Sequence, residues 1–196
     1  MSSILKVDEI QDTSGNNIIN ENANTVTIGK SGDTVNVVGT LQNNGSALSS
    51  GITMANNWRL SSDVTSDAEP VLPWEENDTA GAGKIGSSMT LSSGIFTFPS
   101  TGIYLVTLTA VILEGSNADN LVQIDGYFNS VRMMSTKLHV VNNNDFTTGT
   151  NQVIIDVDDV SKTFKVHYVN NGNSAALQGS TDENRTNLVF LRLGDT

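Results

Sequence analysis

One stretch near the middle of the chain constrains the fold more than any other feature. It covers residues 95–113 and reads IFTFPSTGIYLVTLTAVIL. In a β-strand, successive side chains point to opposite faces, so Tyr104 and Val106 lie on one face and Ile103 and Leu105 on the other. Both faces are largely apolar, with two threonines on the second. One face can fill the core of a sandwich. The other needs a further cover, and the simplest cover is another copy of the same subunit.

The rest of the chain has the composition of short strands joined by polar turns. Val, Ile and Thr dominate the apolar segments, whereas Asn, Ser, Thr and Gly dominate the connections. The sequence therefore predicts an all-β protein, and Asp125-Gly126 is one of the expected turns. The expected strands are Trp58–Ser61, Lys84–Leu91, Ile95–Phe98, Gly102–Leu113, Asn120–Ile124, Ser130–Val141, Gln152–Val157, Thr163–Val169 and Asn187–Leu193.

Charge and cysteine content exclude several kinds of partner. The chain has 196 residues, and 21 Asp and Glu against 10 Lys and Arg give a formal net charge of -11. An acidic chain without a basic cluster binds phosphate backbones and anionic membranes poorly, so we expect neither nucleic acid nor membrane as a partner. Without cysteine there is no disulfide, thiolate metal site or catalytic thiol. The N-terminus lacks the apolar core of a signal peptide, so we expect a soluble protein that is not exported by that route.

Residues 1–52 differ from the remainder. They contain no aromatic residue, and small aliphatic clusters alternate with Gly- and Asn-rich turns. Each cluster is too small to bury a core alone, but three chains wound together, or stacked coils, could bury it; the alternative is a flexible tail. We expect residues 1–52 to form an anchoring arm or short intertwined β-stalk with a linker, and 53–196 to form a head domain. The expected particle-anchoring residues are Ile4, Leu5, Val7, Ile10, Ile18 and Ile19.

The opening of the chain carries a first resemblance. MSSILKVDEIQDTSGNNI, followed by VTIGKSGDTVNVVGTLQNNG, resembles the start of many small structural proteins of tailed bacteriophages. The resemblance covers roughly the first 45 residues. It implies a virion protein that is made in the host cytoplasm and attaches to other virion proteins through this arm.

Residues 55–196 carry a second resemblance, to the trimeric jelly roll shared by complement globular heads and the tumour necrosis factor family. The best motif is Phe96-Thr-Phe98-Pro99-Ser-Thr-Gly102-Ile-Tyr104, similar to that family's phenylalanine, proline, glycine, tyrosine strand pair. Gln123-Ile-Asp-Gly126 is similar to its short hairpin, Thr163-Phe-Lys-Val166 to its penultimate strand, and Asn187–Leu193 to its closing strand. The family's closing phenylalanine-serine-glycine-phenylalanine segment is absent.

This second resemblance implies a homotrimeric TNF-like jelly-roll sandwich. The residues themselves support a trimer, because the strands around Tyr104 and Phe190 are apolar on both faces. We expect the contact between subunits to lie along these strands. The residues expected in the trimer interface and core are Phe96, Phe98, Tyr104, Val106, Leu108, Phe164, Tyr168, Phe190 and Leu193.

Candidate catalytic and metal-binding residues are few. His139 and His167 stand in strand segments without a GxSxG motif, so we interpret them as structural or surface residues. Five aspartates could form a calcium site, but their spacing lacks the glycine and terminal glutamate of an EF-hand loop, and a solvated acidic turn is the preferred interpretation. They are Asp125, Asp145, Asp156, Asp158 and Asp159.

The acidic segments around Trp74 are the remaining candidate. Carboxylates flank Trp74 on both sides, and paired carboxylates beside an aromatic residue suit a glycosidase cleft or a sugar-binding surface. They are Asp67, Glu69, Glu75, Glu76 and Asp78. The plainer interpretation is a loop strapped across the sandwich by Trp74. We expect no catalytic residue, cofactor or metal ion.

Together these features predict a non-enzymatic phage virion surface protein, a trimeric fibre or appendage. The head would be displayed for attachment to a host-surface glycan or protein, with the loops at 114–120, 141–150 and 170–182 carrying any binding. One alternative is a capsid decoration or head-fibre protein that stabilises the shell. An alternative of another class is a small glycan-binding or glycan-hydrolysing module.

Overall fold

A computed structural model of the chain divides it into two compact units, Met1–Ser50 and Gly51–Thr196. In both units the regular elements of the described residues are β-strands, and no helix among them could span a bilayer. The structure describes residues 9–11, 13–14, 17–22, 25–28, 31–43, 46–47, 51–115, 120–140, 145–171 and 174–196.

The N-terminal unit contains two small antiparallel sheets. β1 (Glu9–Gln11), β2 (Asn17–Asn22) and β3 (Thr25–Ile28) form one sheet, and β4 (Gln42–Asn43) pairs with β5 (Ser46–Ala47) in the other. Wherever side-chain burial is described in this unit, the residue is exposed. The exposed fractions of its aliphatic side chains include 40% for Ile10, 62% for Val26 and 94% for Val38. These described residues therefore form no core of their own.

Three of the expected anchoring residues, Ile4, Leu5 and Val7, lie outside the described residues. Ile10 belongs to β1, and Ile18 and Ile19 belong to β2. In the β-sheet register, Ile19 pairs with Ile10 on one side and with Ile28 on the other. The three isoleucines therefore occupy one cross-strand row of this sheet.

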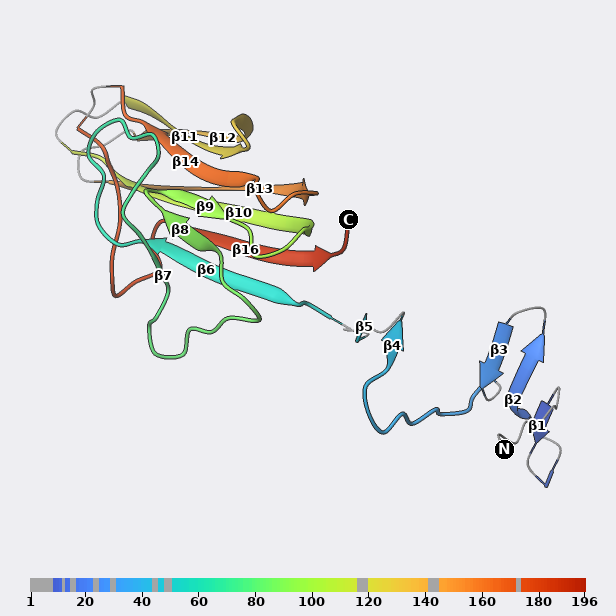
Figure 1. The fold of residues 1–196 in the computed structure, drawn as a ribbon. Coiled ribbons are helices and arrows are strands. Elements are labelled where there is room, and N and C mark those ends of the chain that lie inside the picture. Colours follow the sequence, from blue (N-terminus) through green and yellow to red (C-terminus); the bar gives the residue numbers. More distant parts are fainter. Residues whose placement is uncertain are drawn as a thin grey trace. The chain divides into compact units, whose positions relative to one another are not determined.

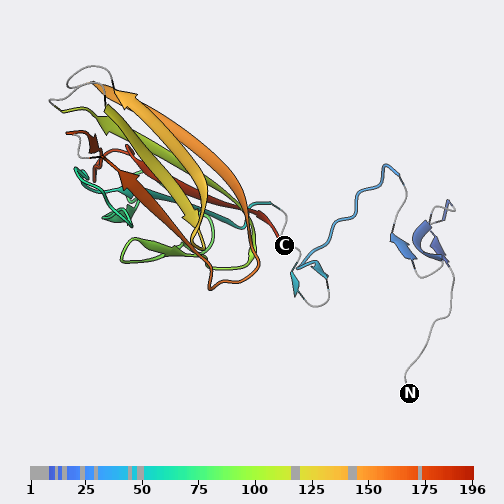
Figure 2. The same cartoon turned by 90° about the horizontal axis from the view of Figure 1, so that it is seen from above.

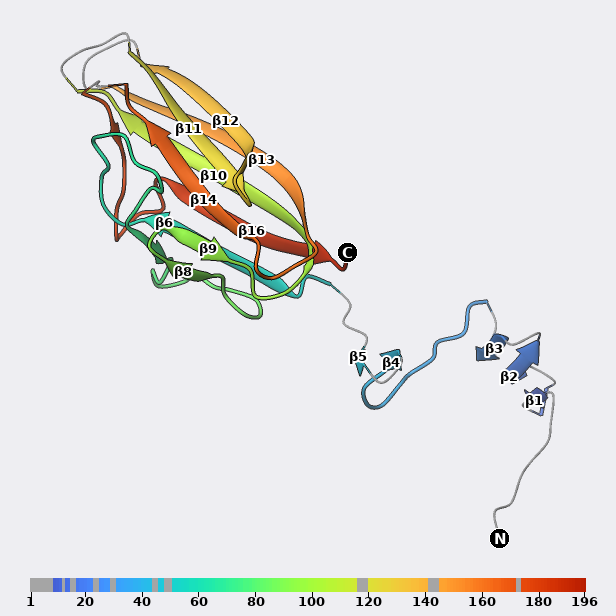
Figure 3. The ribbon, with the colours of Figure 1, turned by 45° about the horizontal axis from the view of Figure 1, so that its top comes forward.

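The C-terminal unit is a sandwich of two antiparallel sheets (Figures 1 and 3). The long strands run along the length of the sandwich, as the view from above shows (Figure 2). An edge strand of one sheet contacts an edge strand of the other, because Asn151 Nδ2 of β13 donates a hydrogen bond to Ser135 O of β12 at 3.3 Å. The first sheet has the order β13-β10-β16-β6-β7, with β15 beside β10, and the second has the order β12-β11-β14-β9-β8. The strands are β6 (Met54–Leu60), β7 (Trp74–Glu76), β8 (Thr90–Ser92), β9 (Ile95–Thr97), β10 (Gly102–Leu113), β11 (Asn120–Phe128), β12 (Val131–Val140), β13 (Phe146–Val157), β14 (Thr163–Val169), β15 (Ala176–Leu177) and β16 (Asn187–Gly194).

The core lies between these sheets and centres on aromatic rings. The ring centroid of Phe190 lies 5.3 Å from that of Phe96 and 5.7 Å from that of Phe164. Such tilted and edge-on contacts add to the free energy gained from burial alone. Burial along β10 alternates strictly, so its even-numbered side chains face the core and its odd-numbered ones face outward.

This alternation shows that most of the side chains expected at the contact between subunits lie in the core of a single chain. Tyr104 and Phe190, expected where subunits meet, are both 0% exposed within a single chain. Of the nine residues expected in the interface and core, only Leu193, at 47% exposure, is not buried in this core. Any contact with a second copy through β10 and β16 must therefore use the alternate side chains of the same strands, such as Leu105 and Leu191.

Several strand boundaries also differ from expectation. The short strands β7 and β15 were not expected. In place of the expected strand Lys84–Leu91, the structure has the shorter strand β8, which begins at Thr90. β11 continues through Asp125-Gly126, so this dipeptide is not a turn. The hairpin instead turns at Asn129-Ser130, where φ values of 45° and 69° match a type I′ turn.

Candidate functional site: an apolar sheet face and an adjoining polar pocket

The outward face of the first sheet carries a row of aliphatic side chains that crosses four strands. Leu105 of β10 pairs with Ile154 of β13 and with Leu191 of β16, and Leu191 pairs with Ala55 of β6. Ala55 in turn bridges to Ile85. Paired residues of antiparallel strands lie on the same face, so these five side chains form one continuous row. The two ends are 62% exposed at Ile154 and 48% exposed at Ile85.

A threonine-rich strip separates this aliphatic row from the far end of the same face. Thr107 accepts a hydrogen bond from Gln152 Nε2 at 3.1 Å, and the hydroxyls of Thr109 and Thr150 lie 3.0 Å apart. Beyond the strip the face becomes apolar again, with Phe146 62% exposed and paired to Leu113. The sheet thus presents apolar side chains at both ends and hydrogen-bonding groups between them.

At the β6 edge of this face, Arg59 holds the following loop in place. It is 1% exposed although its side chain points outward, because residues 75–79 fold over it. Its Nε donates to Glu75 Oε1 at 2.7 Å, and its Nη2 to Asp78 Oδ1 at 2.8 Å. Nη1 donates to Asn77 Oδ1 at 3.1 Å and also to the Thr79 hydroxyl. The planar guanidinium therefore fixes four neighbouring side chains at once.

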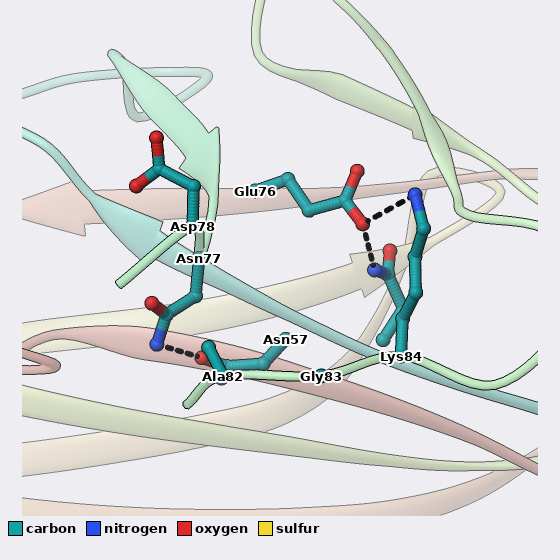
Figure 4. Close-up of a pocket in the computed structure, with 8 residues that line it drawn as sticks. Asn57, Glu76, Asn77, Asp78, Ala82, Gly83 and Lys84 are labelled. Carbon is teal, nitrogen blue, oxygen red and sulfur yellow. Dashed lines mark hydrogen bonds and ion pairs between the residues drawn. The ribbon is translucent and has the colours of Figure 1, made fainter. Parts of the chain in front are cut away.

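A polar pocket of about 340 Å³ opens next to this clamp (Figure 4). Its walls come from β6, from the end of β7 and from the loop that follows β7. Figure 4 shows Asn77 directed toward Asn57, and Glu76 directed toward Lys84. The lining residues are Asn56, Asn57, Glu76, Asn77, Asp78, Ala82, Gly83 and Lys84.

One carboxylate oxygen of Glu76 accepts three bonds in this pocket. Its Oε1 accepts from Asn56 Nδ2 at 3.0 Å, from Ser88 Oγ at 2.9 Å and from Lys84 Nζ at 3.0 Å. Partial burial alone would raise the pKa of Glu76. The hydrogen bonds from Lys84, Ser88 and Asn56, together with the charge of Lys84, outweigh burial and lower this pKa below its ordinary value of 4.5.

Two of the carboxylates considered for a glycosidase cleft are partners of one arginine. Glu75 and Asp78 converge on the single guanidinium of Arg59. These contacts account for both carboxylates as partners of a buried cation. The tryptophan that was expected to strap the loop, Trp74, is 6% exposed, and its indole donates to Val71 O at 2.8 Å. The only sign of the clamp in the sequence is the unbroken run of five residues with hydrogen-bond acceptors at 75–79, four of which bind Arg59.

The five aspartates that were considered as a calcium site do not form one cluster. Asp125 lies on β11, 1% exposed, and accepts from Gln123 Nε2 at 2.7 Å. Asp159 lies in a turn, where the backbone N–H of Ser161 lowers its pKa below the usual 3.8. Within the described ranges, no group of three or more His, Asp or Glu side chains is placed to hold a metal ion.

The two histidines lie on the second sheet, away from the strands that carry the clamp. His139 belongs to β12 and His167 to β14. His167 Nε2 lies 3.9 Å from Glu69 Oε2, and Lys165 Nζ lies 2.6 Å from Glu69 Oε1. The hydrogen bond from Lys165, then its charge and that of His167, lower the pKa of Glu69.

The loops that were expected to carry binding are described only in part. Residues 116–119, 141–144 and 172–173 lie outside the described ranges. Residues 146–150 of the second expected loop belong to β13, and residues 176–177 of the third form β15. Glu114, at the start of the first loop, is fully buried and accepts from Ser174 Oγ at 3.2 Å.

Comparison with known proteins places the C-terminal unit in a fold class. No family model matches the chain, and no curated protein matches it. Among solved structures, Eiger TNF from S. frugiperda matches with a TM-score of 0.56 and 14% identity, covering 73% of this chain and 94% of that one. Murine APRIL matches with a TM-score of 0.51 and 13% identity, covering 71% and 98%. PRD1 vertex protein P5 matches with a TM-score of 0.49 and 13% identity, covering 74% and 99%.

The chain therefore has an all-β fold with a TNF-like jelly-roll sandwich, which confirms the fold predicted from the motif at residues 96–104.

Proposed function

We propose that this chain is a non-enzymatic virion surface protein. Three copies associate through the outward face of β13, β10 and β16, the N-terminal unit attaches them to the particle, and the heads are displayed for attachment to the host surface. The observation that carries the proposal is the aliphatic row from Ile154 through Leu105 to Leu191 on the solvent side of an otherwise well-packed sandwich.

The energetics of this face support self-association. An obligate interface that buries about 1,000 Å² per subunit is of ordinary size. At about 25 cal/mol per Å² its gross gain is roughly 25 kcal/mol, from which the entropy of association is subtracted. Leaving Leu105, Leu191 and their neighbours in water forgoes that gain. The threonine strip supplies groups that can form hydrogen bonds across the same contact.

The N-terminal unit supports the anchoring role. Ile10, Val26 and Ile28 are all at least 40% exposed, so this small sheet needs a cover from outside its own described residues. Equivalent segments of the other two copies, or the particle surface, supply that cover. Three linked heads then present identical sites, and linked weak contacts with a repetitive surface gain avidity.

The trimer is tested by sedimentation of the full chain at micromolar concentration. We expect a species three times the 20.8 kDa mass of the chain. Ile154→Asp combined with Leu191→Asp places charges in the aliphatic row and should yield monomers. The matched control is Val131→Asp, which changes a 60% exposed side chain on the second sheet and should leave the trimer intact. A folded monomer of the unmodified chain at these concentrations contradicts the proposal.

Capsid decoration remains the alternative within the same class, because an anchoring unit serves either role. Attachment is favoured if labelled trimers bind host cells and particles that lack the protein are as stable as complete ones. Trimers that bind no host cell, together with particles that disassemble on deletion, favour decoration.

A further inference from the structure

We infer that the polar pocket beside β6 binds one uncharged sugar ring. The biological role of this site rests on the proposed attachment function, since the sugar would belong to a host-surface glycan. The site itself is argued from its own residues. Its volume of about 340 Å³ lies within the range of roughly 300–1,000 Å³ that is usual for small-ligand sites.

The pocket walls are held in position by bonds within the protein. Asn77 Nδ2 donates to Asn57 Oδ1 at 2.9 Å, and Asn57 Nδ2 donates to Leu188 O at 3.2 Å. Asn77 Oδ1 accepts from Arg59 and from the backbone N–H of Thr79 at 3.1 Å. Because these side chains are already ordered, a ligand does not bear the entropic cost of immobilising them.

These bonds leave both donors and acceptors available on the pocket wall. The amide nitrogens of Asn57 and Asn77 each donate one hydrogen bond and so retain one free N–H. The ammonium group of Lys84 donates to Glu76 and to Ser88 and retains one of its three N–H groups. Glu76 Oε2 and Asp78 Oδ2 accept none of the hydrogen bonds found among the described residues. A sugar hydroxyl both donates and accepts, so neighbouring hydroxyls can satisfy an alternating set of this kind.

The charge of the pocket selects among sugars. Two carboxylates and one ammonium group line it, and the adjoining hollow around Arg59 adds Glu75 and Asp182. An acidic sugar or a phosphate would meet an excess of negative charge. An uncharged ring avoids this repulsion and retains the hydrogen bonds, so the pocket favours neutral hexoses and their N-acetyl derivatives.

The test is saturation-transfer NMR on the full chain with D-glucose, D-galactose, D-mannose and N-acetyl-D-glucosamine, and with N-acetylneuraminic acid as the acidic comparison. We expect saturable binding of at least one neutral sugar with a Kd of about 1 mM, a free energy of about -4 kcal/mol. The acidic sugar should bind at least tenfold more weakly.

A blocking variant and a matched control locate the binding. Gly83 lines the pocket, and a Cβ there would meet nothing within 4 Å, so Gly83→Trp adds a ring at the pocket wall without a clash at its Cβ. It should abolish the signal, whereas Met133→Trp, at a 41% exposed position on β12, should leave it unchanged. Asp78→Ala removes a free acceptor and should weaken binding at least fivefold. Urea unfolding midpoints near that of the unmodified chain establish that each variant is folded.

Absence of neutral-sugar binding, or binding that persists in folded Gly83→Trp, overturns the inference. Its failure is distinct from failure of the proposed function. A trimer that binds no sugar overturns the pocket and leaves the trimer standing, whereas a monomer that binds a neutral sugar overturns the trimer and leaves the pocket standing.

Discussion

At the scale of single residues, Asn56 shows how one buried amide connects three segments of the head. It is 2% exposed, and its Oδ1 accepts from the Trp58 indole and from the backbone N–H of Met89. Its Nδ2 donates to Glu76 Oε1 at 3.0 Å. β6, β7 and the segment that precedes β8 are thereby held together. A buried amide with an unpaired group would destabilise the fold, so the position of Glu76 depends on Asn56 and that of Asn56 on Glu76.

The lowered pKa of Glu76 leads to a prediction of pH dependence. Its contribution to stability is fully present above the unfolded pKa of 4.5 and is lost as the pH falls through the lower folded value. Glu76→Gln should lower the free energy of unfolding at pH 7 by about 1 kcal/mol and make the loss between pH 5 and pH 3 shallower. Urea titrations across this range measure both effects. Asp182→Asn, at an exposed position, is the control, and parallel pH profiles for Glu76→Gln and the unmodified chain would refute the assignment.

At the scale of elements, β11 explains why an expected turn is a strand. Gly126 lies in the middle of the second sheet, paired with Met134 on one side and Val166 on the other. An added Cβ would lie 2.9 Å from the ring of Phe164 and 3.1 Å from the sulfur of Met134. The glycine is therefore required by the close approach of these side chains, and the reversal of the chain is left to Asn129-Ser130.

Overpacking at this position should be measurable. Gly126→Val forces the Phe164 ring and Met134 to move and should lower the free energy of unfolding by about 1–3 kcal/mol. Gly83→Val, where an added Cβ would meet nothing within 4 Å, is the control and should lie within about 0.5 kcal/mol of the unmodified chain. Urea denaturation at pH 7 gives both values, and equal midpoints for the two variants would show that the strand tolerates the extra volume.

At the scale of the whole molecule, the chain has one unit with a core and one whose described side chains are exposed. The buried hydrophobic cluster runs from Met54 to Phe190 and lies entirely within the C-terminal unit. The N-terminal unit contributes none of the described core residues. Among the described residues, the apolar burial that stabilises the fold therefore comes from the C-terminal unit.

This division predicts the behaviour of truncated chains. A fragment of residues 51–196 should fold with a urea midpoint close to that of the full chain, because it retains every described core residue. A fragment of residues 1–50 should show no cooperative unfolding transition by circular dichroism, because its described aliphatic side chains are exposed. Cooperative unfolding of the short fragment as a monomer would show that the N-terminal unit has a core of its own.

The sequence alone determined the features that depend on neighbouring residues. The apolar, β-branched run at residues 103–113, preceded by Gly102, predicts a strand whatever surrounds it, and the absence of aromatic residues before residue 53 distinguishes the N-terminal segment from the rest of the chain. The motif at residues 96–104 predicts the jelly roll. Periodicity alone could not decide which face of β10 is the core, because both faces are largely apolar; only the packing of the second sheet places Tyr104 inside and Leu105 outside. Tertiary structure also decided the Arg59 clamp and the polar pocket, since their bonds join residues that are distant in sequence and meet only when β6 and β7 pair.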